Sequence, residues 1–79
     1  MIIIFSRHAK RRAKLYGIPE ATVESILRRQ ELSEGEHEIV SDVPGFKYPI
    51  KIVVSVENRI VTVVTNYPLK RGKKNESAI

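Results

Sequence analysis

The chain has 79 residues and no cysteine, which allows a single domain with a small core and excludes disulfides and thiolate metal sites. Its 14 Lys and Arg against 9 Asp and Glu give a net charge of +5, which favours polyanionic partners. No apolar run approaches the ~18 residues that span a membrane, and the lack of cysteine fits a cytoplasmic protein.

The first elements in chain order are a strand and a helix. Residues 2–5 are β-branched or aromatic, which predicts a buried strand. Ser6 is a suitable N-cap for a helix over 7–16. Within that helix the apolar positions recur at helical spacing, at Ala9, Ala13 and Tyr16. Gly17 follows and predicts the end of the helix.

A second helix and three strands are predicted after this point. Pro19 fits the first turn of a helix that closes near residue 29. The stretch 33–36 reads as a loop, and strands are expected over 37–42, 48–57 and 60–67.

A two-residue loop at residues 58–59 would pair Glu57 with Ile60 in a hairpin. Continued along both strands, this register places a set of cross-strand pairs on one face: Val56–Val61, Val54–Val63, Ile52–Thr65 and Ile50–Tyr67. We expect that face to meet the helices. The opposite face is half apolar, which suggests either a homodimer surface or cover from the strand at 2–5.

These elements predict an α+β fold. An N-terminal strand precedes two helices packed on one face of an antiparallel sheet of three to four strands. Residues 1–69 are expected to form the single domain, followed by a basic, flexible tail over 70–79.

Two basic clusters, in residues 7–14 and 70–74, lie near opposite ends of the sequence. Folding can bring such clusters into one patch that attracts the phosphate backbone of RNA. The predicted RNA-binding residues are Arg7, Lys10, Arg11, Lys70 and Arg71. The alternative is ordinary solubilising charge.

His8 and Arg12 are four positions apart and therefore project from the same side of the predicted helix. A histidine can transfer protons, and an arginine can bind a phosphate at two points. Thr65 and Tyr67 could add hydroxyl groups from the last strand. Together these four residues are the candidate catalytic set for cleavage of RNA through its own 2′-hydroxyl. No ligand-like spacing of histidine and carboxylate occurs, so neither a metal nor another cofactor is expected.

Two short motifs resemble a known family. They are His8-Ala9-Lys10-Arg11-Arg12 followed by Gly17-Ile18, and Val63-Val64-Thr65-Asn66-Tyr67. The chain resembles, over about residues 2–69, a domain of unknown function grouped with RelE-like toxins and the barnase–EndoU–colicin–RelE class of small ribonucleases.

The resemblance implies a RelE-like fold and a metal-independent ribonuclease, the toxin of a toxin–antitoxin pair, with an antitoxin as protein partner. The family's motif positions fall on His8, Arg12, Thr65 and Tyr67. One departure is Tyr16, where many members carry a second arginine. If that arginine binds phosphate, Arg11 or Arg71 must replace it here.

Three hypotheses follow. The protein is an RNA-cleaving toxin, a non-catalytic RNA- or DNA-binding module, or an interaction module whose outer sheet face pairs with a second copy or an antitoxin.

Overall fold

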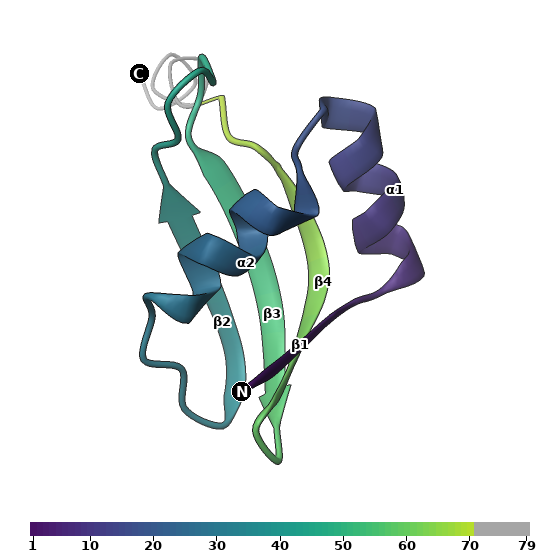
Figure 1. Ribbon diagram of the computed structural model, residues 1–79, viewed down its shortest axis with the longest axis vertical. Helices are drawn as coiled ribbons and strands as arrows, with labels where there is room; N and C mark the ends of the chain where they lie inside the picture. Colours follow the sequence, from purple (N-terminus) through teal and green to yellow (C-terminus); the bar gives the residue numbers. More distant parts are fainter. Residues whose placement is uncertain (71–79) are drawn as a thin grey trace, which may run out of the picture.

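A computed structural model describes residues 1–70 of the chain. Two helices follow the first strand, and three further strands complete the fold (Figure 1). In chain order the elements are β1 (Ile2–Phe5), α1 (Arg7–Tyr16), α2 (Glu20–Arg28), β2 (Gly35–Ser41), β3 (Ile50–Glu57) and β4 (Ile60–Pro68). The predicted α+β fold, with an N-terminal strand and two helices, is confirmed.

The four strands form one mixed sheet in the order β1-β4-β3-β2. The chain connects β2, β3 and β4 through turns, and these strands pair antiparallel. β1 pairs parallel with β4, from Ile2 opposite Ile60 to Phe5 opposite Val63. The prediction of a purely antiparallel sheet therefore misses one pairing. β1 and β4 are separated in the chain by two helices and two strands, so no local turn signals that they pair in parallel.

Local hydrogen bonds set the two ends of α1 as the sequence predicts. The Ser6 hydroxyl accepts a bond from the backbone N–H of Ala9 at 3.0 Å and donates one to the Val64 carbonyl at 3.1 Å. Gly17 has φ 67, a left-handed conformation that favours glycine, and its N–H donates to the end of the helix. Ser6 thus caps α1 and also attaches its first turn to β4.

Replacing Ser6 with Ala removes both of these side-chain bonds. We expect the free energy of unfolding to fall by about 1–2 kcal/mol, because N-cap loss alone costs ~0.5–2 kcal/mol. Urea unfolding followed by circular dichroism measures this change. Ser25→Ala, at an exposed position inside α2, is the matched control, and an equal loss in that variant would contradict the capping role.

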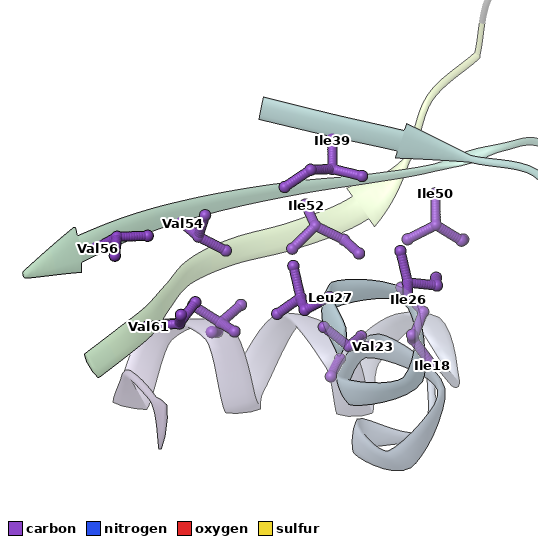
Figure 2. Packing of buried hydrophobic residues seen from close by; sticks show 13 residues of the cluster. Ile18, Val23, Ile26, Leu27, Ile39, Ile50, Ile52, Val54, Val56 and Val61 are labelled. Atoms are coloured by element: carbon purple, nitrogen blue, oxygen red, sulfur yellow. The ribbon is translucent and has the colours of Figure 1, made fainter. Parts of the chain in front are cut away.

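The core lies between the helices and one face of the sheet. In Figure 2 both helices lie on the same side of the strands, and apolar side chains from both layers meet there. The buried apolar side chains are Ala9, Ala13, Ile18, Val23, Ile26, Leu27, Ile39, Ile50, Ile52, Val54, Val56, Val61 and Val63. Small alanines are the buried residues of α1, so this helix can approach the sheet closely.

The β3–β4 hairpin begins as predicted. Its two loop residues both have positive φ, 53 for Asn58 and 66 for Arg59, as a two-residue hairpin loop of the favoured type requires. The next pairs also follow the prediction: Glu57–Ile60, Val56–Val61 and Val54–Val63.

Further along the hairpin the predicted register is wrong. The pairing shifts between Val53 and Val54, so that Val53 lies opposite Thr65 and Val64 is an extra residue in β4. Instead of the predicted Ile52–Thr65 and Ile50–Tyr67 pairs, Ile52 pairs with Asn66 and Ile50 with Pro68. A β-bulge of this kind moves every later side chain of its strand to the opposite face.

The bulge in β4 lies beside Ser6, the residue between the end of β1 and the start of α1. The Ser6 N–H donates to the carbonyl of Val63, and the Ser6 hydroxyl donates to that of Val64. Beyond the bulge Asn66 faces the core with no exposed surface, and its Nδ2 donates to the Ala9 carbonyl at 3.2 Å. The shifted register therefore gives α1 a polar attachment to β4 inside the core.

The outer face of the sheet is half apolar, as predicted. Its exposed apolar side chains are Ile2, Ile4, Val40, Ile60 and Val64. The prediction that the strand at residues 2–5 covers this face is wrong, because β1 lies at the edge of the sheet and extends it.

Candidate nucleic-acid interface

The side of α1 turned away from the core carries a row of basic residues. Arg7, Lys10, Arg11 and Lys14 are separated by three, one and three positions, the spacing of one helical face. All are exposed, whereas Ala9 and Ala13 on the opposite side are buried. We call these four residues the basic stripe.

No carboxylate of α1 neutralises the basic stripe, because the helix sequence RHAKRRAKLY contains no acidic residue. The ion pairs found within residues 1–70 lie elsewhere: Arg28 with Glu24 at 3.8 Å, and Lys51 with Glu38 at 3.1 Å. Among the described residues, then, no carboxylate is paired with the stripe.

A second flank of α1 carries the polar residues His8, Arg12 and Tyr16, each four positions after the one before. The Arg12 Nη1 donates to the Tyr16 hydroxyl at 3.4 Å, a long bond at the surface. His8 is exposed, and Arg12 is partly buried. The predicted side-by-side placement of His8 and Arg12 on one helix is present.

Thr65 and Tyr67 do not join that flank. The bulge places them opposite Val53 and Lys51, on the sheet face that points away from the helices. The predicted register instead placed Thr65 and Tyr67 on the face that meets the helices, opposite Ile52 and Ile50, and the structure corrects that register. The four candidate catalytic residues therefore form two separate pairs.

Tyr67 instead belongs to a polar cluster on the outer face of the sheet. The Lys51 Nζ lies 3.1 Å from the Glu38 Oε1. This hydrogen bond, together with the nearby phenol of Tyr67, raises the pKa of Lys51 above its usual 10.5. Lys51 stays protonated at neutral pH, so it does not act there as a base.

Of the second basic cluster, only Lys70 belongs to the part of the chain that the structure describes. Lys70 is exposed after β4, and the neighbouring Leu69 N–H donates to the Pro49 carbonyl at 2.8 Å, which places this end of the chain beside the loop before β3. Arg71 and the rest of the predicted tail lie outside the described residues.

Two hollows in the surface lie away from α1. An open groove of about 330 Å³ separates α2 from the turn after β2 and is lined by Ala21, Thr22, Ser25, Ile26, Arg29, Asp42, Val43 and Pro44. A smaller one of about 160 Å³ is lined by Met1, Leu32, Val56, Arg59 and Val61. Neither includes a residue of the predicted catalytic set.

Within residues 1–70 no group of three or more His, Asp or Glu side chains is placed to hold a metal ion. In the same part of the chain no helix has the length and apolar character to cross a membrane.

The sequence prediction includes three of the four members of the stripe, Arg7, Lys10 and Arg11. It missed Lys14 as a member of the stripe, although its position seven residues after Arg7 was a usable signal. It also treated Tyr16 as an apolar position, whereas the phenol hydroxyl bonds Arg12 at the surface.

Comparison with known proteins adds no family: no family model matches the chain, and no curated protein or solved structure shows significant similarity to it.

Proposed function

We propose that the protein binds the phosphate backbone of RNA through the basic stripe of α1. The observation that carries this proposal is a row of four exposed cations on a helix without an acidic residue. Ordinary solubilising charge is usually mixed in sign, as on α2, where Glu24 pairs with Arg28.

The physical basis of such binding is counterion release. Cations that neutralise phosphates displace the small ions condensed around the nucleic acid, so affinity falls steeply as salt rises. Arg7, Lys10, Arg11 and Lys14 also lie on a helix fixed by Ser6 and Gly17, which limits the ordering cost of binding.

Removing two stripe residues, Lys10→Ala with Arg11→Ala, is expected to weaken binding to a short RNA hairpin by tens of fold at ~0.1 M salt. The slope of log K against log salt should become less steep by about 1.4–1.8, since each phosphate contact contributes ~0.7–0.9. Alanine favours the helical conformation, so α1 should persist. Fluorescence anisotropy over a salt series measures both quantities.

The matched control is Arg28→Ala with Lys47→Ala, which removes the same charge from outside α1. We expect this variant to lose far less affinity and to keep the salt slope of the unaltered protein. No binding by the unaltered protein at low salt, or equal losses in the two variants, would contradict the proposal.

A second candidate is RNA cleavage, the activity of a toxin. The observation that favours it is the flank of α1 that presents His8, Arg12 and Tyr16 in sequence, with Arg12 bonded to the tyrosine hydroxyl. On this flank the His8 imidazole can transfer a proton, and the Arg12 guanidinium beside it can stabilise the charge of the phosphate. Thr65 and Tyr67 point away from the helices, so this version of the proposal leaves them out.

If the protein cleaves RNA, the purified protein is expected to cut RNA in the presence of EDTA and to leave a 2′,3′-cyclic phosphate end. His8→Ala should then reduce the rate by about 10²–10⁴-fold, the usual contribution of general acid–base catalysis, with RNA affinity unchanged. Gel analysis of labelled RNA measures the rate, and His37→Ala is the matched histidine control. Intact RNA after prolonged incubation would exclude this candidate and leave the binding function standing.

A further inference from the structure

We infer that the basic stripe prefers double-stranded nucleic acid to single strands and binds it without regard to base sequence. This inference rests on the proposed function, since it names the form of nucleic acid that the same four residues accept.

The stripe contains no aromatic ring on which an unpaired base could stack. Proteins that bind single strands combine positive charge with aromatic rings on which the bases stack. Every member of the stripe is Arg or Lys. The nearby Tyr16 lies on the other flank of α1 and accepts a bond from Arg12, while Tyr67 lies on the outer face of the sheet.

The spacing of the stripe is fixed by the helix that carries it. Arg7 and Lys14 are seven residues apart, about 10.5 Å along the axis of an α-helix. α1 is anchored by buried Ala9 and Ala13. Duplex nucleic acid presents a rigid and dense phosphate array, about one charge per 1.7 Å of its axis in DNA. A single strand would have to be ordered against the stripe, which costs conformational entropy.

The side-chain types also argue against sequence readout. Discrimination between bases in a duplex depends on side chains held in a fixed orientation against the base edges, such as Arg on guanine or the amides of Asn and Gln on adenine. The α1 sequence contains neither Asn nor Gln, and within residues 1–70 no hydrogen bond or ion pair holds the guanidinium of Arg7 or Arg11 in one orientation. Phosphate is thus the group recognised, and a DNA or an RNA duplex can supply it.

The test measures the affinity of the full chain, by anisotropy over a salt series, for RNA and DNA duplexes and for their separate strands. With four contacts, slopes near −3.6 for a DNA duplex and −2.8 for single strands are expected. If the affinities converge at 1 M salt, the duplex is favoured by about sixfold at 0.1 M. Duplexes of scrambled sequence should bind equally well.

Single strands that bind as tightly as the duplex, or duplex affinities that follow base sequence, would overturn this inference while leaving the proposed function in place. Failure of every probe to bind would overturn both. The Lys10→Ala and Arg11→Ala variant should lose affinity for both forms and bring their slopes closer together, because the contribution of each contact differs between them.

Discussion

Replacing Asn66 with Asp is expected to lower the free energy of unfolding by roughly 3–5 kcal/mol at neutral pH. Asn66 has no exposed surface, and its Oδ1 has no hydrogen-bond partner. Its Nδ2 donates to the Ala9 carbonyl at 3.2 Å. An Asp carboxylate would replace that donor with a second acceptor, so a negative charge would be buried against a carbonyl oxygen without compensation.

The loss should depend on pH in a defined direction. Burial raises the pKa of an Asp carboxyl, so the folded variant holds a proton that the unfolded chain releases above ~3.9. The penalty is therefore small below that value and grows as the pH rises toward the folded-state pKa. Urea unfolding at about pH 4 and pH 7, with the unaltered protein measured in parallel, isolates this difference.

Asn58→Asp provides the matched control for this substitution. Asn58 is exposed in the β3–β4 loop with φ 53, a conformation that Asp also tolerates. We expect that variant to stay within about 0.5 kcal/mol of the unaltered protein. Equal losses at the two positions, or a loss at residue 66 that does not change with pH, would show that Asn66 is not buried in this way.

Leu27→Ala is expected to cost about 2–5 kcal/mol, because the side chain is fully buried and its removal leaves a cavity. Figure 2 shows Leu27 between α2 and the core face of the sheet, near Ile52. A domain of this length has a total stability of about 4–12 kcal/mol, so the variant would be near the limit of folding. Thermal and urea unfolding measure the change.

Leu15→Ala makes the same chemical change on α1, where the leucine is 69% exposed. Its expected effect is below about 0.5 kcal/mol. If Leu15→Ala destabilises the protein as much as Leu27→Ala does, then a second layer covers α1 in solution.

Much of the fold can be predicted because its signals are local. Ser6 and Gly17 mark the ends of α1 through hydrogen bonds and a left-handed conformation that depend on residues close in sequence. The Asn58-Arg59 loop fixes the first pairs of the hairpin in the same way.

The bulge at Val64 could not be predicted from the sequence. Strand residues Val63, Thr65 and Tyr67 alternate with Val64 and Asn66, and either set is compatible with a half-buried strand. The choice depends on Ser6 and Ala9, which bond the strand from more than 50 positions away. Two of the four candidate catalytic residues were placed on the wrong face for this reason.

The basic stripe, by contrast, depends on helical periodicity alone, so Arg7, Lys10 and Arg11 can be predicted without knowledge of any tertiary contact. The position of Lys70 relative to them depends on where the chain leaves β4, which is a long-range property.

The parallel pairing of β1 with β4 has a consequence for biosynthesis. Ile2 lies opposite Ile60, so β1 leaves the ribosome well before its partner strand β4 and stays unpaired until β4 emerges. Loop closure over such a separation is slow compared with formation of the β3–β4 hairpin. We therefore expect nascent chains that end before β4 to remain sensitive to protease, and protection to arise late and in a single step once β4 has left the ribosome.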